Sequence, residues 1–155
     1  MAKSTFVYVT YIRTTPERLW SALTTDTEFM KQYWFGVHCE SNWTPGSSWK
    51  MVHSNGNISD DGEIVEADPY KRLVIRWRHQ LKPELHAEGE SLCTIELEPV
   101  AETVKLSITH TIDREHSKLI EAVSGGWPKI MANLKSLIEA GAPALTQSST
   151  QAAKG

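Results

Sequence analysis

The sequence predicts an α+β fold in which a curved antiparallel sheet of about six to seven strands wraps around one long C-terminal helix. Three observations predict it. A first strand is followed by two short helical patterns, about six strand-like segments fill the region from Val37 to Ile112, and one long amphipathic pattern follows them. A sheet with one apolar face and a helix with one apolar stripe cover each other when they pack together.

The first elements are a strand and two short helices. Residues 5–13 (TFVYVTYIR) are rich in β-branched and aromatic residues and contain no Gly or Pro, which is typical of a strand. A threonine that can cap, followed by a proline suited to the first turn, predicts a helix over about 16–24. A second helix, capped by Thr25 or Asp26, should run to about Lys31. The two helices should form a connected pair.

The middle of the chain alternates between strand patterns and turn signals. Turns are expected at 42–47, 53–57, 59–62, 67–72 and 81–89. The SDDG stretch at 59–62 is included because Asp and Gly favour turns. Strict apolar and polar alternation is clearest over 73–79, 93–98 and 104–112. Short turns between successive strands predict an antiparallel meander with one apolar and one polar face.

The last element is one long helix. Apolar residues recur at three- and four-residue spacing over about 115–139. Gly125, Gly126 and Pro128 interrupt the pattern. Because proline has no backbone N–H, we expect a kink or a fresh helix start at Trp127.

Length and composition indicate one globular domain. A chain of 155 residues is long enough to bury a single hydrophobic core. We expect that domain to span residues 1–140. The segment 141–155 has no apolar period and is predicted to be a mobile tail.

Charge and cysteine usage exclude several classes. The net charge of −3 gives no overall excess of positive charge, which a nucleic-acid-binding protein would need. The sequence has no run of eighteen apolar residues, so no transmembrane helix is predicted, and its start does not show a signal-peptide pattern. We therefore expect a cytoplasmic protein without a membrane partner. Cys39 and Cys93 are predicted to be reduced and buried; a disulfide between them is the alternative.

Familiar catalytic and metal motifs are missing from the sequence. No two histidines lie four residues apart on a predicted helix, and no His-x-His occurs in a strand, so no metal site is predicted. There is no G-x-S-x-G, phosphate loop or dinucleotide fingerprint. We therefore assign no catalytic residue and no cofactor.

The six tryptophans suggest the apolar wall of a cavity. A strongly curved sheet can leave such a pocket between itself and the helix. The residues predicted to line it share inward-facing positions and are Trp49, Met51, Trp77, His79, Ile108, His110, Trp127 and Met131. The alternative for the large apolar ones is that they are ordinary core, since aromatic side chains dominate cores.

Two histidines continue the apolar faces of their strands. His79 and His110 must each find a hydrogen-bond partner or water, because burying an unpaired polar group is unfavourable. A hydrogen-bonded structural histidine is the default. The alternative is a polar anchor that orients a carbonyl or phenol, or acts as acid or base near neutral pH.

Three segments resemble a known family. They are TTPERLWSALTTDTEFMKQYWFG, GEIVEADPYKRLVIRW and GGWPKIMANLKSLIE. In this order and spacing they resemble the signature segments of the family named for activators of the ATPase of the ninety-kilodalton heat-shock protein, within the START-like (SRPBCC) helix-grip superfamily. The resemblance covers about residues 5–140 and implies a helix-grip fold with an apolar cavity between sheet and long helix. It also implies a possible chaperone partner.

Three functional hypotheses follow. The leading one is binding of a small hydrophobic or aromatic ligand between the sheet and the long helix, in a monomer or homodimer of uncharacterised physiological role. The second is an enzyme that uses His79 or His110 as acid or base. The third is a co-chaperone role in the stress response, in which an outer surface stimulates a heat-shock chaperone's ATPase.

Overall fold

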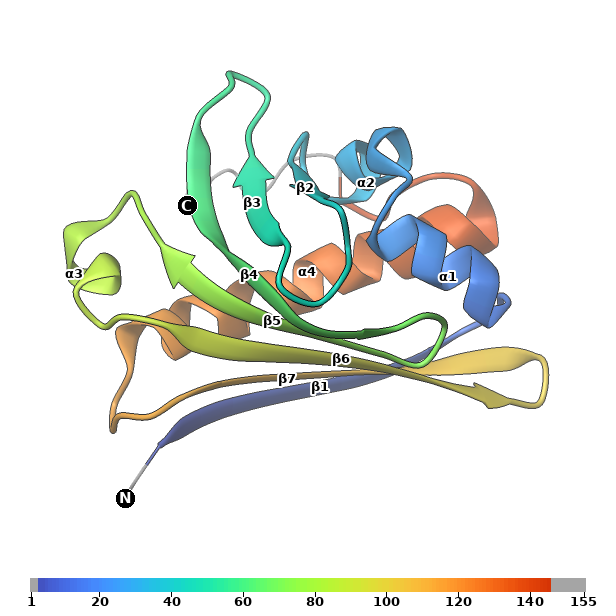
Figure 1. Cartoon of the computed structure of the whole chain (residues 1–155). Helices are drawn as coiled ribbons and strands as arrows, with labels where there is room; N and C mark the ends of the chain where they lie inside the picture. Colours follow the sequence, from blue (N-terminus) through green and yellow to red (C-terminus); the bar gives the residue numbers. More distant parts are fainter. Residues whose placement is uncertain (1–2, 146–155) are drawn as a thin grey trace.

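A seven-stranded antiparallel sheet and a long helix make up most of the computed structural model, which describes residues 3–145 (Figure 1). The strands are β1 (Ser4–Ile12), β2 (His38–Ser41), β3 (Ser48–Val52), β4 (Ile58–Asp68), β5 (Arg72–His79), β6 (Ser91–Val100) and β7 (Thr103–Ile112). The helices are α1 (Pro16–Leu23), α2 (Thr27–Tyr33), α3 (Pro83–His86) and α4 (Lys118–Ala140). The α+β prediction is confirmed, including two short helices directly after the first strand.

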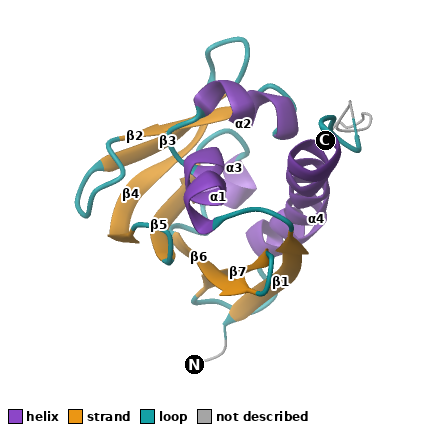
Figure 2. Cartoon of the chain, turned by 90° about the vertical axis from the view of Figure 1, so that its right-hand side faces the viewer, coloured by secondary structure: helices purple, strands orange, loops and turns teal. Residues whose placement is uncertain are grey.

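The sheet has the strand order β1-β7-β6-β5-β4-β3-β2, and each neighbouring pair is antiparallel. Strands β2 to β7 form the expected meander, and β1 returns to pair with β7. The sheet curls from β2 round to β1 with α4 on its concave side (Figure 2). Sheet curvature therefore sets how closely α4 can approach each strand.

Side-chain caps fix where the two short helices begin. Thr15 Oγ1 accepts a hydrogen bond from the backbone N–H of Arg18 at 3.1 Å at the start of α1. Asp26 Oδ1 accepts one from the N–H of Phe29 at 3.3 Å at the start of α2. Of the two candidate caps for the second helix, the structure therefore uses Asp26. Each cap satisfies an N–H that has no partner inside the helix.

Helix α4 is continuous. Ser117 caps its start by accepting from the N–H of Ile120, and Gly141 ends it in the left-handed conformation with φ 84°. The fresh start expected at Trp127 is wrong, because α4 runs on through Pro128. Proline removes one backbone hydrogen bond, and burial of the C-terminal half of α4 against the sheet and α2 outweighs that loss.

The turn predicted at 59–62 is also wrong, because these residues lie inside β4. The turn propensity of the Asp-Asp-Gly sequence is overridden by pairing with β5. Gly62 has a specific role there: a Cβ at this position would overlap the carbonyl oxygen of Arg76. β4 therefore approaches β5 more closely than any other residue type would allow.

The core fills the space between the sheet and the C-terminal half of α4. Leu106, Ile108, Met131 and Leu134 are fully buried there. The two cysteines are buried and free, as the sequence predicted. None of the helices within residues 3–145 is long and apolar enough to cross a membrane. The predicted tail lies outside the described residues from position 146 onward.

Candidate functional site

The N-terminal half of α4 packs on β7 through Leu119 and Ile120 but does not seal against strands β3 to β5. Two adjoining cavities of about 620 Å³ and about 210 Å³ open between this half of the helix, residues 34–37 after α2, helix α3 and strands β3 to β5. Their walls share Trp34, Met51, Ala122, Gly126 and Ile130. Because these residues border both spaces, the two cavities form one groove along α4, called the α4 groove below.

Three indole rings make the aromatic wall of the groove. The ring of Trp127 lies 5.5 Å from that of Trp34 and 5.9 Å from that of Trp77, both in edge-on contact. All three rings line the smaller cavity, and Trp34 lines the larger one as well. Edge-on contacts of this kind hold aromatic rings in fixed positions. The wall is therefore a preformed apolar surface.

Two adjacent glycines open the helix side of the groove. Gly125 and Gly126 line the larger cavity, and a Cβ built at either position meets no atom within 4 Å. Glycine inside a helix destabilises it by about 1 kcal/mol relative to alanine. The pair therefore gives up helix stability where its missing side chains leave free space.

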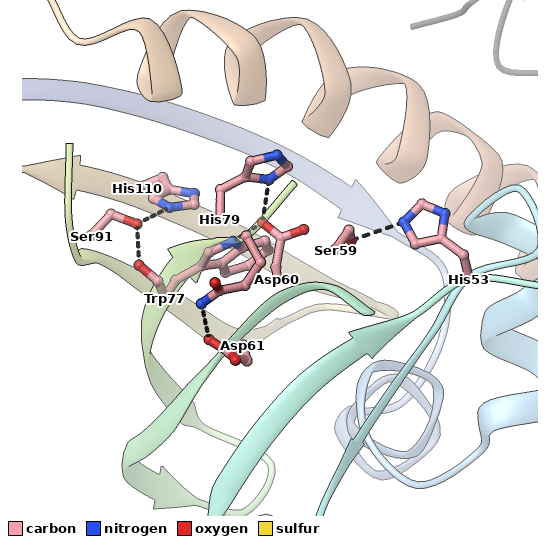
Figure 3. Close-up of polar contacts among 9 residues, drawn as sticks. His53, Ser59, Asp60, Asp61, Trp77, His79, Ser91 and His110 are labelled. Carbon is pink, nitrogen blue, oxygen red and sulfur yellow. Dashed lines mark hydrogen bonds and ion pairs between the residues drawn. The ribbon is translucent and has the colours of Figure 1, made fainter. Parts of the chain in front are cut away.

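The buried carboxylate of Asp60 hydrogen-bonds two rings that line the sheet side of the smaller cavity, those of Trp77 and His79. Asp60 Oδ2 accepts a hydrogen bond from Trp77 Nε1 at 2.7 Å and lies 3.1 Å from His79 Nδ1 (Figure 3). Burial alone would raise the pKa of Asp60, but hydrogen bonds from His79, Ser59 and Trp77 together lower it below its ordinary value. Asp60 is therefore ionised at neutral pH and fixes the orientation of the His79 ring.

His79 has one ring nitrogen left over. Its Nδ1 is held by Asp60, while its Nε2 is buried and has no hydrogen-bond partner among the described residues. The ring lines the smaller cavity. A buried polar atom without a partner is unusual in folded proteins and calls for an explanation.

Both ring nitrogens of His110 are already hydrogen-bonded. Trp127 Nε1 donates to its Nδ1 at 3.2 Å, its Nε2–H donates to Ser91 Oγ at 2.8 Å, and the Ser91 hydroxyl donates to the Trp77 carbonyl at 3.1 Å. Burial lowers the pKa of His110 to about 4, against an opposing effect of the Asp60 charge. The ring is therefore neutral at pH 7 and fully hydrogen-bonded, which leaves it no free nitrogen for acid or base chemistry.

The eight predicted cavity residues divide into two groups. Those that line the α4 groove are Met51, Trp77, His79 and Trp127. Those that lie in the packed core are Trp49, Ile108, His110 and Met131. Trp49, for example, packs against Trp77 with ring centroids 4.6 Å apart and ring planes inclined by 48°. Contact of any of the eight with a ligand stays a prediction.

Sequence reasoning missed several groove residues, chiefly Asp60, Lys82, Gly125, Gly126, Lys129 and Ile130. A signal existed for some of them. Two glycines inside an amphipathic pattern are unfavourable for a helix, so they indicate a position where the absence of a side chain leaves needed room beside the helix. Asp60 shares the strand face of Ile64, four residues on, but only if the strand begins before position 60. Within residues 3–145, no group of three His, Cys, Asp or Glu side chains could hold a metal ion.

Comparison with known proteins gives one family match. The model of a family described as Activator of Hsp90 ATPase homolog 1-like protein matches residues 13–139. A comparison with curated proteins found no match.

Solved structures from three organisms are similar in fold. A protein of Mesorhizobium loti is 22% identical with a TM-score of 0.74, covering 88% of this chain and 97% of that one. The Aha1 dimer from Colwellia psychrerythraea is 21% identical with a TM-score of 0.71, covering 89% and 98%. A Plasmodium falciparum protein described as an HSP90 activator is 21% identical with a TM-score of 0.69, covering 86% and 94%. At these identities the likeness shows the fold.

Proposed function

The chain belongs to the family of Activator of Hsp90 ATPase homolog 1-like proteins, and from that premise we propose that it binds a small hydrophobic or aromatic molecule in the α4 groove. The family match agrees with the resemblance that the three sequence segments indicated. The observation that carries the proposal is the groove itself. Its larger cavity of about 620 Å³ falls within the usual size range of small-molecule sites, roughly 300–1,000 Å³.

The chemistry of the wall supports the same proposal. Small-molecule sites are mostly apolar with a few placed polar groups. The α4 groove has three indoles, the flexible thioether of Met51 and two hydrogen-bonded imidazoles, His53 and His79. Methionine adapts its shape to what it contacts, so the wall suits a ligand whose outline varies. We propose that this ligand binding takes place in the cytoplasm.

The proposal is tested with a neutral apolar dye, N-phenyl-1-naphthylamine, whose fluorescence rises in apolar surroundings. We expect saturable binding to the wild-type chain. Gly126→Phe should abolish or strongly weaken it, because the new ring would fill free space in the groove. Ala140→Phe is the matched control: it adds the same ring at an exposed position at the end of α4. No saturable binding by the wild type, or equal binding by both variants, would exclude the α4 groove as a ligand site.

Family membership favours a second candidate, binding to a heat-shock chaperone. One similar structure is described as an HSP90 activator, at 21% identity. The test is the ATPase rate of the cell's own chaperone with and without the purified chain. A stimulation that Gly126→Phe leaves intact would assign the chaperone role to a surface other than the groove, whereas no change in rate would exclude this role.

A further inference from the structure

We propose that the ligand of the α4 groove is an acid: an amphiphile with an apolar body and one anionic head group, which lies at the α3 end of the groove beside Lys82 and His79. This inference rests on the proposed binding function and adds the chemical class and the orientation of the ligand. Three observations carry it.

The first is the charge of the groove wall. The whole chain has a net charge of −3, yet the charged side chains that line the groove are Lys82, Lys129 and a single carboxylate, Asp60. The negative charge of Asp60 is already engaged by hydrogen bonds from Trp77 and His79. The groove is therefore locally positive in a protein that is negative overall, which favours an anion.

The second is that these two lysines are free. Within residues 3–145 the lysines that form ion pairs are Lys31, Lys50 and Lys135. Lys82 lies at the start of α3 and borders the smaller cavity, and Lys129 borders the larger one. Their ammonium groups are therefore available to a ligand, one at each end of the groove.

The third observation distinguishes the two ends. His79 Nε2 is buried without a partner and its ring points from β5 toward α4 (Figure 3). Because ionised Asp60 accepts from Nδ1–H, Nε2 carries an N–H only in the doubly protonated ring. An anionic head group beside Nε2 would favour that form and accept its hydrogen bond, which would remove the unpaired group. At the other end, His53 Nε2 already hydrogen-bonds Ser59 Oγ at 2.8 Å. The head group is therefore placed beside Lys82 rather than Lys129.

The rest of the ligand would lie along α4. The groove is bordered by helix residues from Leu119 to Ile130, a span of about 16 Å at the rise of an α-helix. That length suits two fused rings with a substituent, or a medium-length alkyl chain. The body would then contact the indole of Trp34 and the backbone at Gly126, which line both cavities.

The experiment compares two probes that differ mainly in charge. N-phenyl-1-naphthylamine is neutral, and 8-anilinonaphthalene-1-sulfonate carries the same aromatic body with one sulfonate. We expect Lys82→Gln to raise the Kd of the sulfonate about 2- to 5-fold and to leave that of the neutral probe unchanged. Added salt should weaken binding of the sulfonate alone.

Two control variants make the same change of charge. Lys129→Gln alters the other end of the groove and should raise the Kd of the sulfonate less than 2-fold. Lys71→Gln lies in the exposed turn between β4 and β5 and should have no effect. All three lysines are at exposed positions, so these variants should fold normally.

The outcomes separate the two proposals. If neither probe binds, the proposed function fails and this inference fails with it. If both bind but Lys82→Gln leaves the Kd of the sulfonate unchanged, the groove binds apolar molecules and the acidic ligand is excluded. If Lys129→Gln weakens the sulfonate as much as Lys82→Gln does, the orientation of the head group is overturned.

Discussion

The two halves of α4 meet the same sheet in opposite ways. In the C-terminal half, Met131 and Leu134 are fully buried and pack without space against the strands. In the N-terminal half, Gly125 and Gly126 leave a cavity of about 620 Å³. Backbone geometry is helical in both halves, so the difference lies in the side chains: large ones fill the core, and two glycines leave the groove open. We therefore expect stability and binding to be separable along one helix.

The two inward-facing histidines show the same division. His110 lies behind the wall of the α4 groove, against Trp77 and Trp127, with both ring nitrogens hydrogen-bonded and its pKa lowered to about 4. His79 lines the α4 groove with Nδ1 bound to Asp60 and with Nε2 buried and unpartnered among residues 3–145. One residue type thus has a structural role behind the groove wall and, by our proposal, a binding role on the groove surface.

Truncating one apolar side chain in each half gives the largest contrast in stability. Leu134→Ala should lower the free energy of unfolding by about 2–5 kcal/mol, because it creates a cavity in a packed region. Ile130→Ala should lower it by less than half as much, since Ile130 is only half-buried and already borders open space. Urea unfolding measures both values. Equal losses would show that the two halves are packed alike.

The pH dependence of stability tests the structural role of His110. The ordinary pKa of histidine, 6.5, falls to about 4 for His110 in the folded chain, so folding favours its neutral form. The free energy of unfolding has its full value above about pH 6.5. It should fall by roughly 3 kcal/mol in total as the pH falls to about 4, because the unfolded chain takes up a proton at this residue before the folded chain does. Gln does not titrate, so His110→Gln should show a shallower decline over that window. Parallel stability curves for the two proteins would contradict the assignment.

At pH 7 the same variant should be less stable than the wild type. A glutamine cannot reproduce both hydrogen bonds of the ring, so His110→Gln should lose about 1–3 kcal/mol. Urea unfolding at pH 7 provides this reference value for the pH series.

The smallest expected effect has the opposite sign. Gly126→Ala should raise the free energy of unfolding by about 0.5–1 kcal/mol, because its Cβ meets no atom and alanine favours the helix. Binding of the neutral probe should persist, since one methyl group leaves most of the groove open. Gly141→Ala is the control and should be destabilising, because that residue has a φ of 84°. A loss of stability in Gly126→Ala would show that the space is filled in solution.

Local patterns predicted the elements, and long-range contacts decided the site. The alternation over 104–112 and the apolar period over 115–139 were sufficient to predict β7 and α4 within a few residues. Asp60 was misplaced in a turn, because the bond that holds it comes from Trp77 on the next strand. His79 and His110 were indistinguishable for the same reason: Ser91, which satisfies His110, lies on a third strand.

The central claim, that the open end binds a small apolar molecule while the filled end does not, is tested most directly by NMR of the methionine methyl groups. Met51 lines both cavities of the α4 groove, and Met131 is fully buried in the filled half. On titration with N-phenyl-1-naphthylamine, the signal of Met51 should shift and saturate while that of Met131 stays nearly unchanged. A saturable shift of Met131 without one of Met51, or no shift of either, would contradict the account.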